Sequence, residues 1–128
     1  MTRTSLIALS ALTALTIAAC GSQGDSARSA KVVATTNVWG SIATAVAGGH
    51  ADVKAILTND AADPHSFEAS PADAAAIADA TLVVINGGGY DHWADDVLKN
   101  HKNVTTVDAY SLLPHSAAGE ANEHVFYN

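Results

Sequence analysis

The chain has 128 residues, of which 48% are apolar and 15% are charged. This composition is too apolar for a disordered chain, and the length suits one ordinary domain. Alanine accounts for 27 of the residues, so large core side chains are scarce. A domain of this size buries only about 60–65% of its unfolded surface. We therefore expect either a single domain with a small hydrophobic core or one lobe that packs against another lobe or partner.

The charge balance narrows the possible partners. Six Lys and Arg stand against thirteen Asp and Glu, which gives a net charge of −7. Nucleic-acid binding needs a basic stripe, whereas the four lysines of this chain are scattered along the sequence. We therefore expect no nucleic-acid partner.

The N-terminus predicts a bacterial lipoprotein leader. A single arginine precedes a run of fourteen mostly apolar residues, 6–19. That run is too short for a membrane span, which needs about 20 residues, and is typical of a secretory signal. Two alanines before Cys20 resemble a lipobox, in which the Cys is acylated and becomes the new N-terminus. We expect a signal peptide over 1–19, lipidation at Cys20 and a flexible tether over 20–30. The alternative is a signal peptide cut nearby, with Cys20 incidental.

Strand and helix signals alternate through the rest of the chain. They predict strands at 31–35, 52–57, 81–85 and 104–107, and helices at 39–47, 71–80 and 91–100. Asn37 is expected to cap the first helix and Gly48-Gly49 to end it, whereas Ser70-Pro71 starts the second. The apolar strand at 81–85 is of the kind that is buried on both faces. This order predicts an α/β fold with a parallel sheet and flanking helices.

In such sheets, ligands collect beyond the carboxyl ends of the strands. The loop after the second predicted strand holds Asp63-Pro64-His65, and the proline stiffens it. A neutral imidazole is a good zinc ligand, and Asp63 or Glu68 lies within reach to orient His65 or to add negative charge. Taken alone, a His in a polar loop is more often a plain surface residue.

His124 is the second candidate ligand, since it stands at the entrance to the apolar segment 125–127. Taken alone, His124 is also more often a surface residue than a ligand. The sequence contains no HExxH and no CxxC pattern. Any metal site must therefore be assembled from distant segments.

Three glycines at 87–89 follow a buried strand. They lack the spacing of a nucleotide-binding loop, so we interpret them as a tight strand-to-helix turn. Tyr90 and Trp93, which flank Asp91, are expected to pack at the rim of the ligand crevice.

Several of these motifs occur together in an order that resembles one family. The lipobox at Cys20, the tether, DPHSFE at 63–68, Ser70-Pro71 and NGGGYDHW at 86–93 look like the zinc- and manganese-binding lipoproteins of ABC importers. The segment 122–127 resembles the one that carries the second His ligand of that family.

The resemblance implies two lobes joined by a long helix, with the metal in the cleft and two ligands from each lobe. His65 and His124 match the ligands of the N-terminal lobe, and residues 31–128 would form that lobe. The ligands of the C-terminal lobe would lie beyond residue 128. The implied cargo is Zn²⁺, with Mn²⁺ as the alternative. The implied protein is a monomer, extracytoplasmic, anchored to the membrane by a lipid, and it delivers its metal to an ABC permease without a catalytic step.

A rival interpretation is a secreted metal-dependent hydrolase, with His65, Asp63 and Glu68 around an open-coordinate metal. The two interpretations differ in the role of Glu68, which would be a general base in the hydrolase.

Overall fold

The computed structural model describes residues 29–114 and 122–127. The signal peptide over 1–19, Cys20 and most of the expected tether lie outside the described residues. The elements, in chain order, are β1 (Ala30–Thr36), α1 (Asn37–Ala47), β2 (Ala51–Leu57), α2 (Pro71–Ala78), β3 (Leu82–Ile85), α3 (His92–Leu98), β4 (Thr105–Asp108) and the short 3-10 helices η1 (Tyr110–Leu112) and η2 (Val125–Tyr127). No helix in this part of the chain is long and apolar enough to cross a membrane. The predicted alternation of strands and helices is confirmed.

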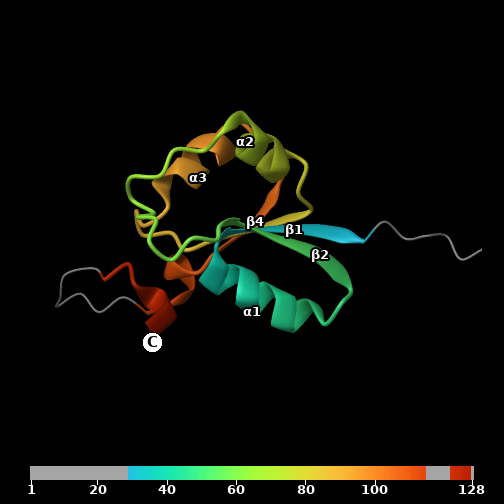
Figure 1. Cartoon of the computed structure of the whole chain (residues 1–128), viewed down its shortest axis with the longest axis horizontal. Helices are drawn as coiled ribbons and strands as arrows, with labels where there is room; N and C mark the ends of the chain where they lie inside the picture. The colour runs from blue at the N-terminus through green and yellow to red at the C-terminus, as the bar shows by residue number, and fades with distance from the viewer. Residues whose placement is uncertain (1–28, 115–121, 128) are drawn as a thin grey trace, which may run out of the picture.

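The four strands form one parallel sheet in the order β2-β1-β3-β4 (Figure 1). Val32 of β1 is in register with Val53 on one side and with Leu82 on the other. The chain winds outward from β1 to β2 and then crosses to β3 on the opposite side of β1. The order therefore reverses between β1 and β3, and such a switch point opens a crevice at the carboxyl ends of the strands.

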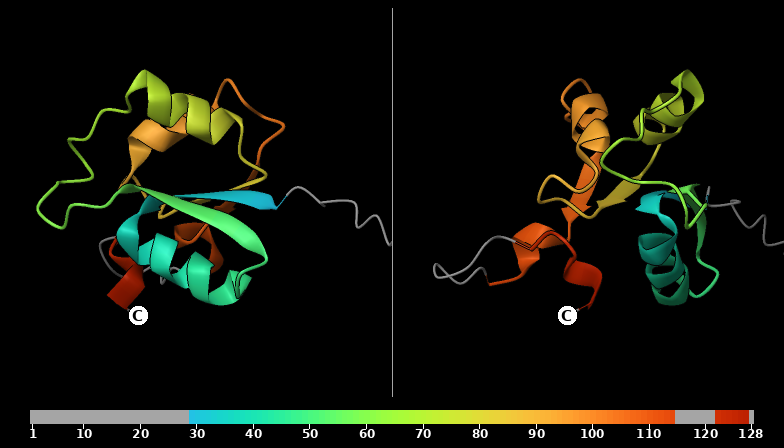
Figure 2. Two further views of the ribbon diagram at one scale, coloured as in Figure 1. Left: turned by 45° about the vertical axis from the view of Figure 1, so that its right-hand side comes forward. Right: turned by 60° about the vertical axis from the view of Figure 1, so that its left-hand side comes forward.

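Helices lie on both faces of the sheet, with α2 and α3 on one face and α1 on the other (Figure 2). The main core lies under α2 and α3. Ile77, Val83, Ile85 and Trp93 are each at most 4% exposed there. Phe67 extends this core, because its ring packs edge-on against Trp93 at a centroid distance of 4.8 Å.

The predicted start of α2 is confirmed. The Ser70 hydroxyl accepts a hydrogen bond from the backbone amide of Asp73, and the Asp73 carboxylate accepts one from the amide of Ser70. Pro71 occupies the first turn, where its missing N–H costs nothing. Helix α1 ends at Gly48-Gly49, as expected, and Gly48 adopts the left-handed conformation with a φ of 54°.

Two expectations about local structure are wrong. Asn37 is the first residue of α1, after Thr36, and its side chain donates to the Asp60 carboxylate and not to the helix. The strand near 81–85 is also not buried on both faces. Val83 and Ile85 are buried, but Leu82 and Val84 are partly exposed, because α1 covers only part of its face of the sheet.

Candidate metal centre

Three segments meet where the strands end, namely the loop 58–70 after β2, the turn 86–91 after β3 and the segment 122–127. Asn86 connects the second and third of these segments, because this buried side chain donates to the backbone carbonyl of Glu123 at 2.7 Å. The side-chain oxygen of Asn86 accepts a hydrogen bond from the Trp39 indole at 3.1 Å. The segment that carries His124 is thereby tied to β3 and α1.

The turn 86–91 is built around the buried carboxylate of Asp91. It accepts hydrogen bonds from the backbone amides of Asn86 at 2.7 Å and of Gly87 at 2.9 Å. The Thr35 hydroxyl donates to it at 2.5 Å. Gly87 has a φ of 75°, and a Cβ there would lie 2.0 Å from the Asp108 side chain. The glycines therefore make a tight strand-to-helix turn, as expected.

His65 is oriented by Asp63. The Asp63 carboxylate accepts from the His65 backbone amide at 3.0 Å and lies 3.1 Å from the ring Nδ1. An ionised carboxylate only accepts, so Nδ1 carries the hydrogen and Nε2 keeps its lone pair. The pKa of Asp63 is lowered, chiefly by the backbone hydrogen bond from His65 and then by the bond from its ring. Asp63 therefore stays ionised and keeps the ring in this tautomer.

His124 has the same local arrangement two residues after Asn122. The Asn122 side-chain oxygen accepts from the His124 backbone amide at 3.1 Å and lies 3.0 Å from its Nδ1. Because that oxygen already accepts from the amide, Nδ1 of His124 is the ring donor. Both imidazoles are nearly half exposed and therefore accessible to a ligand from solvent.

The ring of Tyr90 lies against both imidazoles. Its centroid is 5.0 Å from that of His65 and 5.4 Å from that of His124, and both contacts are edge-on. Burial raises the pKa of the Tyr90 hydroxyl, and nearby charges raise it further. A hollow of about 410 Å³ adjoins this cluster and is lined by Tyr90, His124 and Phe126, among others.

Glu123 is one of the residues at this site that the sequence did not single out. Its Oε1 lies 3.5 Å from Nε2 of His65 and 3.8 Å from Nδ1 of His124. The pKa of Glu123 is lowered, chiefly by its own backbone amide and, when the imidazoles are protonated, also by the two histidines. The nearest signal in the sequence is its position directly before His124.

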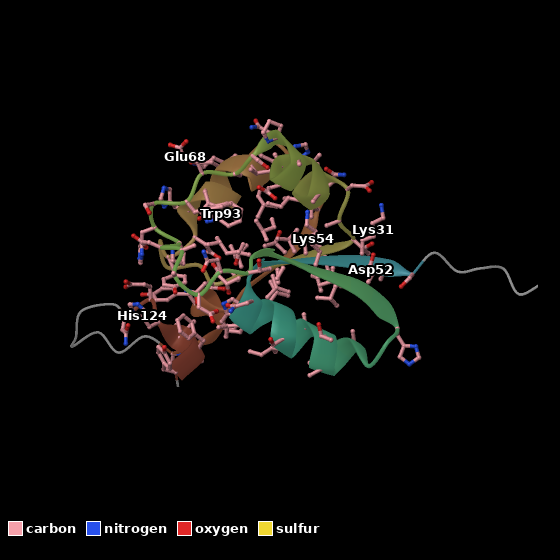
Figure 3. The ribbon with its side chains drawn as sticks, viewed as in Figure 1. Lys31, Asp52, Lys54, Glu68, Trp93 and His124 are labelled. Carbon is pink, nitrogen blue, oxygen red and sulfur yellow. The ribbon has the colours of Figure 1, made fainter. Side chains whose placement is uncertain are left out.

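Glu68 does not join this cluster. It lines a separate hollow beside α3, with Phe67, His92 and Trp93 among its neighbours. Figure 3 shows Glu68 and His124 at clearly different places on the molecule. No described contact therefore supports the expectation that Glu68 orients or supplements His65. The same expectation for Asp63 is supported by its two contacts with His65.

The donor set suits a divalent transition metal, although it is incomplete. Within residues 29–114 and 122–127, no group of three or more His, Cys, Asp or Glu is arranged to hold a metal ion. His65 presents an Nε2 lone pair towards a carboxylate oxygen 3.5 Å away. Two such electron-rich atoms repel unless a cation or proton lies between them, and zinc binds nitrogen and oxygen at about 2.0–2.2 Å. Two imidazoles would fill half of a tetrahedral shell.

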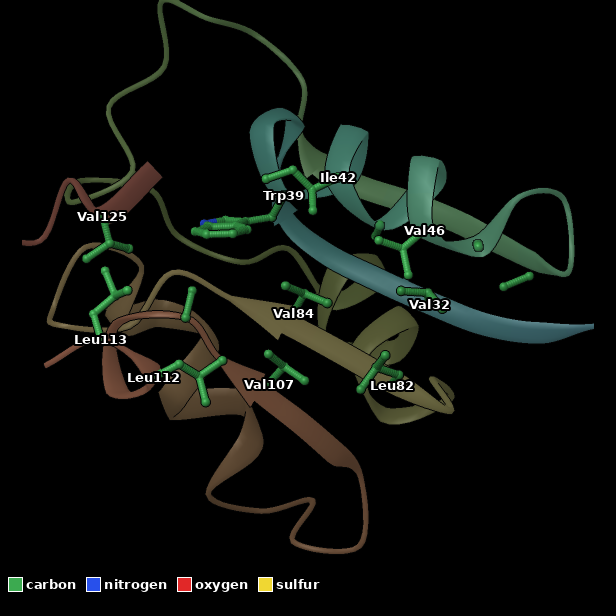
Figure 4. Close-up of a pocket in the computed structure, with 14 residues that line it drawn as sticks. Val32, Trp39, Ile42, Val46, Leu82, Val84, Val107, Leu112, Leu113 and Val125 are labelled. Carbon is green, nitrogen blue, oxygen red and sulfur yellow. The ribbon is translucent and has the colours of Figure 1, made fainter. Parts of the chain in front are cut away.

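A larger hollow lies elsewhere, on the α1 face of the sheet (Figure 4). We call it the apolar groove. It has a volume of about 550 Å³ and is lined almost wholly by apolar side chains, among them Ile42 and Val46 of α1, Leu82 and Val84 of β3, Val107 of β4, and Leu112, Leu113 and Val125. It offers a metal no donor side chain. The groove lies over the part of this sheet face that α1 does not cover.

A parallel α/β unit with two oriented imidazoles at the switch point of its sheet has the features of a metal-binding lobe. Comparison with known families gives the same class. Residues 32–128 match the model of the family described as ZnuA, zinc-uptake complex component A periplasmic. The chain belongs to this family, which comprises solute-binding transport proteins and not enzymes, so the hydrolase alternative is not supported.

Individual relatives are similar over part of their length. The manganese-binding lipoprotein MntA of Halalkalibacterium halodurans is 27% identical over 99 residues, which cover 74% of this chain and 33% of the relative. The Zn(II)-bound ZnuA-like domain of AdcA from Streptococcus pneumoniae has a TM-score of 0.64 at 24% identity, over 74% of this chain and 36% of that one. The solute-binding protein FpvC of Pseudomonas aeruginosa, in complex with Mn²⁺, has a TM-score of 0.63 at 25% identity, over 76% and 37% respectively. The chain thus spans about a third of the length of these relatives.

Proposed function

We propose that this chain is the N-terminal lobe of an extracytoplasmic solute-binding protein that captures a divalent transition metal for an ABC importer. His65 and His124 are the ligands that this lobe contributes, and the membrane permease receives the metal. The observation that carries the proposal is that residues 59 positions apart in sequence present their rings to the same Tyr90 and the same Glu123. Family membership supports the role in transport.

Zinc is the favoured cargo and manganese the alternative. Neutral imidazole nitrogen is a preferred ligand of zinc, whereas manganese favours carboxylate and water oxygen. Two of the donors here are imidazoles whose Nδ1 atoms are engaged by Asp63 and Asn122, which leaves Nε2 for the metal. The relatives include a zinc-bound domain and a manganese-binding lipoprotein.

The remaining ligands belong, on this proposal, to a second lobe. Residues 31–128 then form one lobe of a larger protein. Two findings support this: the relatives are about three times as long as the matched part, and the apolar groove leaves part of one sheet face open. Lipidation of Cys20 would hold the protein at the membrane, where a tether raises its concentration near the permease.

The experiment measures Zn²⁺ binding by this chain in competition with a chromophoric chelator. The wild-type chain is compared with the variants His65→Ala and His124→Ala. The control is His50→Ala, because His50 is exposed and lies between α1 and β2, at the opposite end of the strands. The folded state of each variant is verified by circular dichroism.

We expect each ligand variant to lower the affinity for zinc at least about tenfold, whereas His50→Ala leaves it unchanged. We also expect the wild-type chain to bind more weakly than a complete four-ligand site would. Equal affinity in all four proteins would show that the zinc site lies elsewhere.

A further inference from the structure

Tyr90 contacts both of the proposed ligands, which come from segments far apart in sequence. Both ring contacts are within the range in which aromatic pairs attract each other, at 5.0 Å to His65 and 5.4 Å to His124. The interplanar angles, 77° and 72°, are nearly equal. The two imidazoles therefore make closely similar contacts with one ring.

The backbone that carries Tyr90 is fixed to the sheet. The Tyr90 amide donates to the Gly87 carbonyl at 3.1 Å, which closes the turn. The next residue, Asp91, is fully buried and accepts three hydrogen bonds from Thr35, Asn86 and Gly87. The backbone position of Tyr90 is thus set by β1 and β3, and its ring also packs against Phe126 at a centroid distance of 5.5 Å.

The histidine segments themselves are irregular. His65 lies in a loop of thirteen residues between β2 and α2, and His124 precedes a single 3-10 turn. Asp63 and Asn122 each fix the tautomer of one ring, but neither links the two rings to each other. An aromatic ring that is held on a fixed backbone and contacts both imidazoles would limit how far apart they lie.

We infer that Tyr90 is a positioning residue, which fixes the spacing and tilt of the His65 and His124 imidazoles before the metal arrives. The role in metal binding rests on the proposed function, whereas the positioning of the two imidazoles by Tyr90 does not depend on that function. Preorganised ligands bind a metal more tightly because less ordering is left to the binding step. The aromatic ring carries this role, and the hydroxyl does not.

The test combines two measurements on the same variants. The first is the set of NMR nuclear Overhauser contacts of the imidazole ring protons of His65 and His124 without metal, which report where each ring lies. The second is the affinity for Zn²⁺. The variants are Tyr90→Phe, which keeps the ring, and Tyr90→Leu and Tyr90→Met, which remove it. The matched control is Tyr127→Leu, since Tyr127 is 83% exposed and its ring packs on Phe126.

We expect Tyr90→Leu and Tyr90→Met to change the nuclear Overhauser contacts of both imidazole rings and to lower the zinc affinity about 10- to 100-fold. Tyr90→Phe should match the wild type in both measurements, and Tyr127→Leu should keep the wild-type affinity. If one of the two ring-removing variants does not fold, the other supplies the comparison.

Unchanged nuclear Overhauser contacts of both imidazoles after removal of the ring would overturn the inference. So would changed contacts with unchanged zinc affinity, if His65→Ala still lowers that affinity. If His65→Ala and His124→Ala leave zinc binding intact, the proposed function fails instead, and the contacts of the two imidazoles alone decide whether Tyr90 positions them.

Discussion

At the scale of single residues, the site repeats one device. In Asp63-Pro64-His65 and in Asn122-Glu123-His124, the side chain two positions before the His accepts hydrogen bonds from both its amide and its Nδ1. The ring is thereby held over its own backbone with Nε2 directed away. This explains how two half-exposed histidines on irregular segments each present a defined nitrogen to the solvent.

Glu123 adds negative charge between these rings, and we predict that its charge matters for metal capture. Glu123→Gln keeps the shape of the side chain and removes a charge that lies 3.5 Å from Nε2 of His65. The attraction in water between a divalent cation and one carboxylate a few ångströms away corresponds to roughly tenfold in affinity. We expect Glu123→Gln to weaken zinc binding by about that factor, measured by competition titration.

Glu68→Gln is the matched control, because Glu68 has the same charge but lines the hollow beside α3. We expect it to bind zinc as the wild type does. An equal loss in both variants would mean that net charge, and not the position of Glu123, governs the effect.

The two glutamates also show what the sequence could and could not predict about the site. His65 and His124 could be found because their motifs occur in a recognisable order along the chain. Glu68 drew attention because it stands three residues from His65. Glu123 is 58 residues away from His65 in sequence, and tertiary contacts such as the hydrogen bond from Asn86 to its carbonyl bring it there. Proximity in sequence is a poor guide where loops meet.

At the scale of secondary structure elements, one of the two predicted helix starts is correct and the other is wrong, and the difference is again whether the interacting residues are close in sequence. The start of α2 at Ser70-Pro71 was predictable, because the capping box is made within four residues. The role expected of Asn37 failed, because its side chain bonds to Asp60, 23 residues further on. A local signal is reliable when its partner is also local.

Helix α3 carries two adjacent carboxylates with opposite effects on stability. Burial raises the pKa of Asp95, and the charge of Asp91 one turn earlier raises it further. The hydrogen bond from Lys99 lowers the pKa of Asp96. A raised pKa means that ionisation disfavours the folded state, so this cost appears as the pH rises through the ordinary carboxyl range and is full above the folded-state pKa.

We therefore predict that Asp95→Asn stabilises the protein near pH 7 and has little effect near pH 2.5, where the carboxyl is protonated in both states. The expected rise in Tm is roughly 1–3 °C, because partial solvent exposure screens the charges. Asp96→Asn, one residue away, should lower the Tm slightly at pH 7. Thermal unfolding followed by circular dichroism at the two pH values measures both. A lower Tm for Asp95→Asn at pH 7 would contradict the prediction.

At the scale of the whole molecule, the sheet is covered unequally. Two helices pack on one face, whereas α1 alone lies over the other, chiefly on β1 and β2. The sequence predicted the alternation, because each strand and helix has its own pattern. It could not predict that Leu82 and Val84 would be partly exposed, because burial of those side chains depends on what lies above β3 and β4.

We predict that the apolar groove binds the fluorescent dye ANS (8-anilinonaphthalene-1-sulfonate) to the folded chain. A concave apolar surface of this size is unusual on an isolated domain. Val46 and Leu112 stand on its two sides and are 83% and 72% exposed, so a lysine at either position disturbs little of the core. We expect Val46→Lys and Leu112→Lys each to remove most of the fluorescence enhancement.

The control separates the groove from other causes of dye binding. Ala45→Lys places the same charge on α1, at an exposed position that lines a different hollow, and should keep the enhancement. ANS is an anion, so an added lysine would by itself attract it, and a loss of signal must come from the lost apolar surface. Loosely packed states also bind the dye, but they lose their near-ultraviolet circular dichroism. Dye binding that survives both groove variants, with that dichroism intact, would locate the apolar surface elsewhere on the molecule.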